Sequence, residues 1–154
     1  MNEKKKVLIA YTTAGIGHKK AALAVNEALK NSSHNLDVKL IDCLTYTNPF
    51  FKKIYCATYL LLINKLIFLW GIFYYLLDIR FVHFLFYPIR RLSHVVNSIR
   101  LVNFLRSYKP DVVISTHFLL PDVCDYAKKK YGLTMYVINI IRIIGLTRFG
   151  YQKV

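Results

Sequence analysis

Short apolar runs rich in β-formers alternate along the chain with segments of helical periodicity. The runs span residues 6–11, 38–41, 111–116 and 134–138. Between the first two, apolar residues recur every three or four positions over 18–30, which is typical of a helix packed on one face. A basic helix is predicted over 93–108, stopped by Pro110, and another opens at Pro121 and is capped by Gly132. Strands alternating with helices predict an α/β fold, a doubly wound, Rossmann-like parallel sheet.

The segment over about 49–92 departs from this alternation and is interpreted as an insertion. It is too long for an ordinary crossover, and its many aromatic residues are mixed with Lys and Arg against the single acid Asp78. Residues 54–77 are interrupted only by Asn64 and Lys65, so a membrane span has to be considered. A single span would place the runs 6–11 and 111–116 on opposite sides of the bilayer, where they could not share a sheet. Polar residues and Pro88 break up the next apolar run, so no second span can return the chain.

We therefore predict a helix or helical hairpin that lies in the membrane interface. Tyrosine and tryptophan would lie at the headgroup level, and basic side chains would reach anionic phosphates. The residues predicted to contact the membrane are Lys52, Lys53, Lys65, Trp70, Tyr74, Tyr75, Arg80, Arg90 and Arg91. The alternative is that these aromatics fill the core of a larger helical subdomain.

Composition favours an anionic partner in a reducing compartment. The 154 residues carry a net charge of +14, from 22 Lys and Arg against 8 Asp and Glu, and the mean hydropathy is +0.33. Acidic lipids and nucleic acid both fit this charge. Because the aromatics alternate with Leu and Ile rather than with glycine and polar residues, we expect no nucleic acid partner.

The three cysteines, Cys43, Cys56 and Cys124, form no C-x-x-C pair, so we expect reduced packing thiols and no metal site. The N-terminus lacks the apolar core of a signal peptide, so export is not expected.

Candidate chemistry falls at the carboxyl ends of the predicted strands, where parallel α/β sheets bind ligands. The turn 12–18 contains Gly15 and Gly17, which allow close backbone approach, followed by His18. Thr116 and His117 follow the third apolar run. Histidine is well suited to remove a proton from a hydroxyl near neutral pH, and we assign that role to His18. A nicotinamide dinucleotide site stays open as an alternative, since Asp42 ends the second run, although the third glycine of that fingerprint is missing.

Several motifs in order resemble one known family. They are the loop over 14–22, Asp42, Asn48-Pro49, the aromatic basic stretch and the segment 109–117. Over roughly residues 6–138 the chain resembles the N-terminal domain of monogalactosyldiacylglycerol synthases and processive diacylglycerol glucosyltransferases. The resemblance implies the N-terminal, acceptor-binding half of a two-domain GT-B fold.

The family resemblance also implies a function, namely glycolipid synthesis by inverting transfer of a hexose from a UDP-sugar to diacylglycerol. The protein would be peripheral, on the cytoplasmic face of the membrane, and would need no cofactor. His18 would be the general base. Gly15 and Gly17 would shape the space near the sugar and the donor phosphates, and Thr116 and His117 would bind the acceptor.

The end of the chain departs from the family pattern. The family usually carries Thr-Asp near 138–140, where this chain has Ile-Asn-Ile, and residues 139–154 match nothing in it. We expect an acceptor domain over 1–138, a divergent tail over 139–154, and no C-terminal donor-binding domain. The chain alone is then expected to transfer no sugar and to depend on a separately encoded donor-binding half. The alternative is a stand-alone peripheral membrane-binding module without catalysis.

Overall fold

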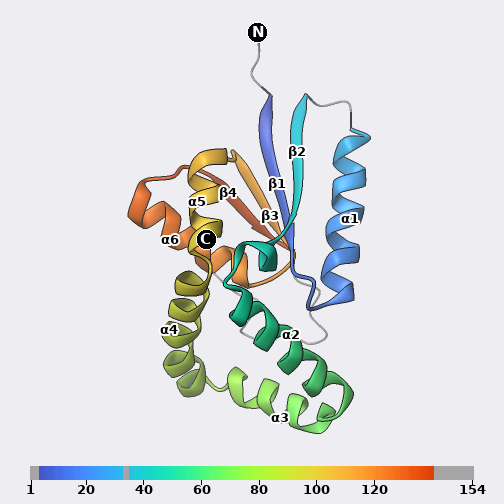
Figure 1. Ribbon diagram of the computed structural model, residues 1–154, viewed down its shortest axis with the longest axis vertical. Coiled ribbons are helices and arrows are strands. Elements are labelled where there is room, and N and C mark those ends of the chain that lie inside the picture. Colours follow the sequence, from blue (N-terminus) through green and yellow to red (C-terminus); the bar gives the residue numbers. More distant parts are fainter. Residues whose placement is uncertain (1–3, 33–34, 141–154) are drawn as a thin grey trace.

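The computed structural model describes residues 4–32 and 35–140, and its elements follow the predicted alternation (Figure 1). The strands are β1 (Lys5–Tyr11), β2 (Leu36–Asp42), β3 (Val112–Ser115) and β4 (Tyr136–Asn139). The α-helices are α1 (Ile16–Lys30), α2 (Pro49–Asn64), α3 (Ile67–Asp78), α4 (Arg80–Asn97), α5 (Ile99–Tyr108) and α6 (Leu119–Tyr131). A short 3-10 helix, η1 (Cys43–Tyr46), follows β2.

The strands form one parallel sheet in the order β2-β1-β3-β4. Val7 of β1 pairs with Val38 of β2 on one side and with Val112 of β3 on the other. The chain leaves β1 toward β2 and later returns to the opposite side of β1, so the strand order reverses between β1 and β3. Ligands bind beyond the carboxyl ends of the strands at such a reversal. The predicted α/β, Rossmann-like sheet is confirmed, and β1 and β3 mark where its site should lie.

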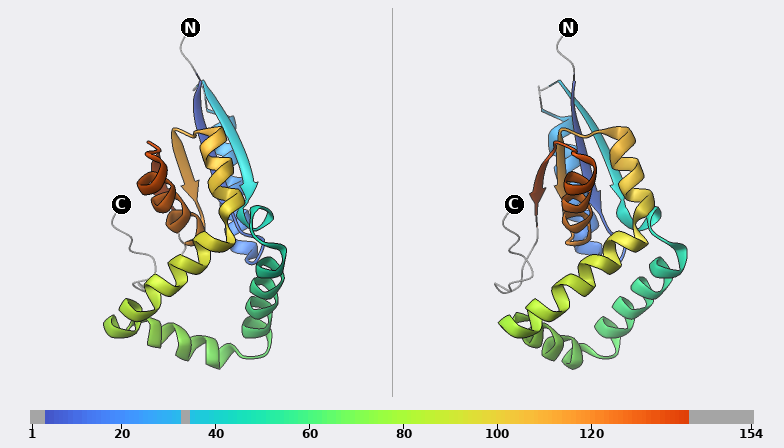
Figure 2. Two further views of the ribbon diagram at one scale, coloured as in Figure 1. Left: turned by 60° about the vertical axis from the view of Figure 1, so that its left-hand side comes forward. Right: turned by 90° about the vertical axis from the view of Figure 1, so that its left-hand side faces the viewer.

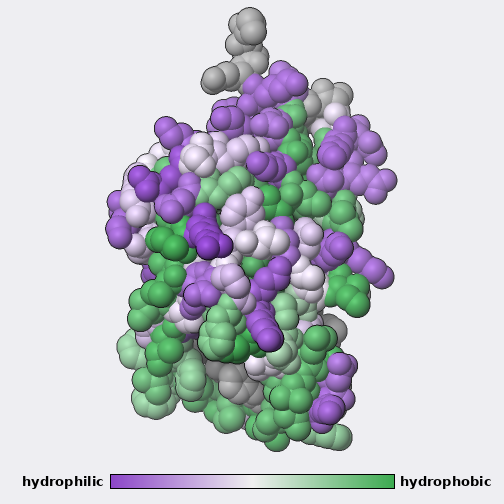
Figure 3. Space-filling view, in the orientation of Figure 1, coloured by the Kyte–Doolittle hydropathy of each residue, from purple (hydrophilic) through white to green (hydrophobic). Residues whose placement is uncertain are grey.

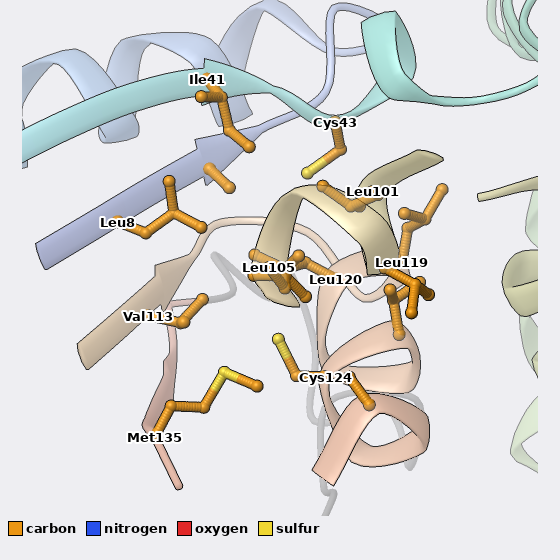
Figure 4. Close-up of a cluster of buried hydrophobic side chains, with 14 of the residues drawn as sticks. Leu8, Ile41, Cys43, Leu101, Leu105, Val113, Leu119, Leu120, Cys124 and Met135 are labelled. Carbon is orange, nitrogen blue, oxygen red and sulfur yellow. The ribbon is translucent and has the colours of Figure 1, made fainter. Parts of the chain in front are cut away.

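Alternate residues of β1 pack against helices on opposite faces of the sheet. Val7 and Ile9 face α1, whereas Leu8 and Ala10 face the larger core beneath α5 and α6 (Figures 1 and 2). That larger core is shown in Figure 4, which includes the buried side chains of Leu101, Leu105, Leu119, Leu120 and Cys124. Cover on both faces explains why the strands read as continuous apolar runs.

Two helix boundaries differ from the sequence-based expectation. The helix predicted over 93–108 is interrupted at the buried Ser98, where α4 ends and α5 begins, because the Asn97 carbonyl accepts from the Asn48 amide at 2.8 Å. Helix α6 starts at Leu119, before Pro121. A proline is tolerated in this first turn because the N–H that it lacks would have no partner within the helix. Gly132 caps α6 with a left-handed φ of 64°, as predicted.

Helices α2, α3 and α4 extend from the carboxyl edge of the sheet and turn back to it (Figures 1 and 2). The Asn48 side chain accepts from the Phe50 amide at 2.9 Å and so caps α2. The hydrogen bond between Asn48 and Asn97 joins the start of this segment to its end. We call residues 49–97 the helical insertion; its last helix continues past the predicted boundary near residue 92.

Among the described residues, most of the exposed large hydrophobic side chains belong to the insertion. Figure 3 shows hydrophobic residues gathered over the end of the molecule formed by α2, α3 and α4, and hydrophilic residues at the opposite end. On α3, Phe68 is 87% exposed and Tyr75 is 77% exposed. None of the helices in the described parts of the chain combines the length and apolar character that crossing a bilayer requires.

Candidate functional site

The loop between β1 and α1 brings Gly15 against the ring of His18. Gly15 precedes α1 in an extended conformation, and its amide donates to the Thr12 carbonyl at 3.5 Å. A Cβ atom at Gly15 would lie 2.7 Å from Cδ2 of His18 and 3.3 Å from the hydroxyl oxygen of Tyr59. These distances leave no room for a side chain, so the close approach of His18 requires glycine here. Gly17, in contrast, has open space where a Cβ would lie.

Thr116, at the carboxyl end of β3, holds the first turn of α1 against the sheet. Its amide donates to the Ala10 carbonyl at 3.0 Å, which extends the ladder between β1 and β3. Its buried hydroxyl donates to the His18 carbonyl, also at 3.0 Å. The predicted substrate-binding residue Thr116 therefore fixes the backbone of the predicted base.

The structure brings His18 and His117 together from the ends of two neighbouring strands. Their ring centroids are 5.0 Å apart, with the planes at 83° in an edge-on contact. Nδ1 of His117 accepts from the Leu119 amide at 3.2 Å, so a neutral ring carries its proton on Nε2. That N–H lies 3.1 Å from the Tyr55 hydroxyl oxygen, to which it donates. His117 is thus held in one tautomer by groups on both sides.

Both rings are neutral near pH 7. Burial lowers the pKa of His18, and a hydrogen bond with the Thr116 backbone acts in the opposite direction. Burial lowers the pKa of His117 well below its usual value, and Coulomb interactions with His18, His94 and Arg90 act in the same direction. A neutral imidazole is able to accept a proton. His18 is only half-buried and so meets both requirements of a general base, the correct protonation state and access.

Two tyrosines of α2 reach the same place, and neither was expected there from the sequence. Tyr55 contacts His117, and the hydroxyl of Tyr59, one helical turn later, approaches Gly15. Burial raises the pKa of Tyr59, so its hydroxyl stays protonated. The spacing of four residues indicates that the two side chains share a face of a helix, but no pattern in the sequence says what that face contacts.

The other end of the insertion is held to α6 by buried charge. Asp122 is fully buried and accepts from Nδ1 of His94 at 2.6 Å, while Nε of Arg90 lies 3.5 Å away. Arg91 pairs with Asp125 of the same helix. Arg90 and Arg91 were predicted to contact the membrane, but the side chain of Arg90 is 14% exposed and both residues turn toward α6. A guanidinium held away from water needs a counter-ion, and the acids of α6 supply it. Because these acids are distant from the arginines in the sequence, the pairs could not be predicted from it.

The remaining predicted membrane-contacting residues are distributed over the insertion. Lys53, Lys65, Tyr75 and Arg80 are exposed, and Lys52 is half-buried. The side chains of two further residues, Trp70 and Tyr74, lie outside the described part of the structure. Contact with a membrane stays a prediction for this group.

Asp42 has a local role at the end of β2. Its carboxylate accepts from the amides of Leu44 at 3.1 Å and Thr13 at 3.3 Å, and it also pairs with the Thr13 hydroxyl. The residue therefore caps η1 and ties it to the glycine loop. These contacts account for Asp42 without a ribose, which removes the main support for the nicotinamide dinucleotide alternative.

A comparison with known proteins identifies the family of the chain. The family model of monogalactosyldiacylglycerol (MGDG) synthase matches residues 18–142, a stretch that begins at His18 and contains the helical insertion, Thr116 and His117. Neither the curated proteins nor the solved structures give a match. The family match covers the greater part of the chain and confirms the resemblance carried by the motifs. The chain belongs to the MGDG synthase family of glycolipid glycosyltransferases.

Proposed function

We propose that this domain binds the free hydroxyl of a diacylglycerol at the membrane surface and presents it for transfer of a hexose from a UDP-sugar. The position of His18 carries the proposal. Its neutral imidazole contacts His117, and its backbone is bonded to Thr116 just after β3, at the edge from which the apolar insertion extends. Family membership supports glycolipid synthesis in general. The UDP-sugar as donor and diacylglycerol as acceptor are what we propose in addition.

In the proposed reaction, His18 takes the proton of the lipid hydroxyl as that oxygen attacks the anomeric carbon. The new carbon–oxygen bond forms while the bond from the sugar to the UDP phosphate breaks, and UDP leaves with the electron pair. Attack opposite the leaving group inverts the anomeric carbon. Gly17 leaves open space at the first turn of α1, and a helix N-terminus is favourable for phosphate. We propose that a second, donor-binding half holds most of the UDP-sugar.

The insertion supplies the surface proposed to dock on the cytoplasmic leaflet. Burying a phenylalanine side chain fully is worth about 1.5–3 kcal/mol, so a few such groups are enough for stable contact. Lys53, Lys65 and Arg80 would attract acidic headgroups. The exposed aromatic side chains available for this contact are Phe50, Phe68, Tyr75, Phe81, Phe84 and Phe86.

Cosedimentation with phosphatidylglycerol-containing vesicles tests docking. A Phe68→Ser variant is expected to bind at least about tenfold more weakly, because a phenylalanine that is now 87% exposed would lose its burial in lipid. Tyr136→Ser is the matched control, since Tyr136 is 79% exposed but lies on β4, outside the insertion. Equal effects of the two substitutions would contradict docking through the insertion.

Transfer is measured with radiolabelled UDP-glucose and UDP-galactose on vesicles that contain diacylglycerol. The chain is assayed alone and mixed with the donor-binding domain of a family member. We expect transfer in the mixture, lowered about 10²- to 10⁴-fold by His18→Ala, the range for loss of a general base. Vesicle binding without transfer in either assay would favour the alternative, a membrane-binding module without catalysis.

A further inference from the structure

We propose that Tyr59 binds the acceptor hydroxyl beside His18, and that Tyr55 is a positioning residue that holds His117 behind them. This inference rests on the proposed function and names two residues that act in that site. Both tyrosines belong to α2. The insertion would then recognise the acceptor as well as dock on the membrane.

Two polar atoms converge beside the glycine loop. The hydroxyl oxygen of Tyr59 and Nε2 of His18 lie 3.3 and 3.6 Å from one point, the place that a Cβ of Gly15 would occupy. That point is itself closed by Cδ2 of His18 at 2.7 Å, so the proposed lipid hydroxyl lies beside it, where it donates its proton to the neutral imidazole and accepts from the tyrosine hydroxyl. These two hydrogen bonds orient the nucleophilic oxygen before the sugar arrives.

The two faces of α2 differ in the way this role requires. Tyr55 and Tyr59 are half-buried against the histidines, whereas Phe50, Ile54 and Leu61 are exposed. Tyr59 lies about 8 Å of helical rise before the end of α2, where the chain turns into α3. With α3 at the bilayer, a diacylglycerol hydroxyl reaches Tyr59 by rising roughly that distance, while its acyl chains stay in the membrane.

Tyr55 acts through His117 and not on the lipid itself. The ring of His117 is held between the Leu119 amide at 3.2 Å and the Tyr55 hydroxyl at 3.1 Å. It in turn contacts the ring of His18 edge-on. A shift of α2 would remove one of the two hydrogen bonds of His117 and loosen the surface against which His18 packs.

A comparison of two lipids isolates the proposed hydrogen bond. Vesicles of one phosphatidylcholine and phosphatidylglycerol composition contain either 1,2-dioleoylglycerol or its 3-acetyl ester, which lacks the free hydroxyl. The ratio of binding to the two vesicles measures recognition of that hydroxyl. We expect a ratio of about five to one hundred for the wild-type chain, the usual worth of two neutral hydrogen bonds. In Tyr59→Phe, which keeps the bond to His18, we expect this ratio to fall about two- to tenfold, with unchanged binding to vesicles without either lipid.

Two further variants complete the experiment. Tyr136→Phe also removes an exposed tyrosine hydroxyl, on β4 and outside the insertion, and should keep the wild-type ratio. Tyr55→Phe should lower the ratio without weakening adsorption to plain anionic vesicles, which a general loss of fold would weaken. If Tyr59→Phe keeps the wild-type ratio, the role of Tyr59 is overturned. If Tyr55→Phe keeps the wild-type ratio, the role of Tyr55 is overturned. A ratio of one in the wild-type chain instead overturns the proposed acceptor, and the inference with it.

Discussion

Replacing Gly15 with alanine should displace His18 and leave the fold in place. The added Cβ would lie 2.7 Å from Cδ2 of His18, whereas carbon atoms in contact are about 3.5–4.0 Å apart. The imidazole therefore has to move by about 1 Å. Gly15 has a φ of −141°, which alanine adopts freely, so the effect is steric and not a matter of backbone conformation.

The size of the effect follows from this clash. Overpacking costs about 1–3 kcal/mol, and the stiffer unfolded chain of an alanine variant offsets about 0.4–1 kcal/mol of it. We expect Gly15→Ala to lose about 1–2 kcal/mol of unfolding free energy. A misplacement of about 1 Å at a reacting group lowers the rate by up to about 10²-fold, so activity should suffer more than stability.

Gly17→Ala is the matched control, since no atom lies within 4 Å of its added Cβ. It should leave His18 in place and gain up to about 1 kcal/mol from the helix propensity of alanine. Urea denaturation measures the stabilities, and nitrogen NMR of the histidine rings reports the position of His18. Unchanged His18 signals in Gly15→Ala would refute the reasoning, as would equal shifts in the two variants.

The remaining predictions concern buried charge, pH and thiols. Asp122→Ala should cost about 3–5 kcal/mol of unfolding free energy, because it removes the buried counter-ion of the Arg90 guanidinium. Asp125→Ala, at a more exposed pair, should cost less than about 1 kcal/mol in the same urea titration. The pKa of His117 is lowered in the folded state, so below about pH 6.5 the unfolded chain binds more protons than the folded one. The unfolding free energy should therefore fall on acidification, by at most about 1.4 kcal/mol per pH unit for this residue. His117→Asn should flatten this dependence of the unfolding free energy on pH. Burial raises the pKa of Cys124 to about 12, so iodoacetamide at pH 8 should modify the half-buried Cys56 well before Cys124 in a mass-spectrometric time course.

The sequence predicts those features of this protein that depend on neighbouring residues. The apolar run 6–11 is a strand, Gly132 caps a helix, and His18 lies in the first turn of α1 after the glycine loop, because each follows from local periodicity or backbone freedom. The partners of Tyr55 and Asp122 could not be predicted in this way. Periodicity says which side chains share a helix face, but only the packing of distant segments decides what that face contacts. Arg90 shows the same limit, since a basic residue in an aromatic segment fits either a lipid phosphate or a buried acid.

The bond between Asn48 and Asn97 has a consequence for how this domain can diversify. It closes the insertion at the sheet, and the contacts of Tyr55 and Arg90 lie near the same closure. Residues 60–86, between those attachments, can change in length and composition without altering the register of the strands or the placement of His18. With the insertion docking on the membrane as proposed, lipid preference and sugar chemistry can evolve at different rates. Exchanging this stretch between family members should then transfer the proposed membrane selectivity of one protein to the site of another.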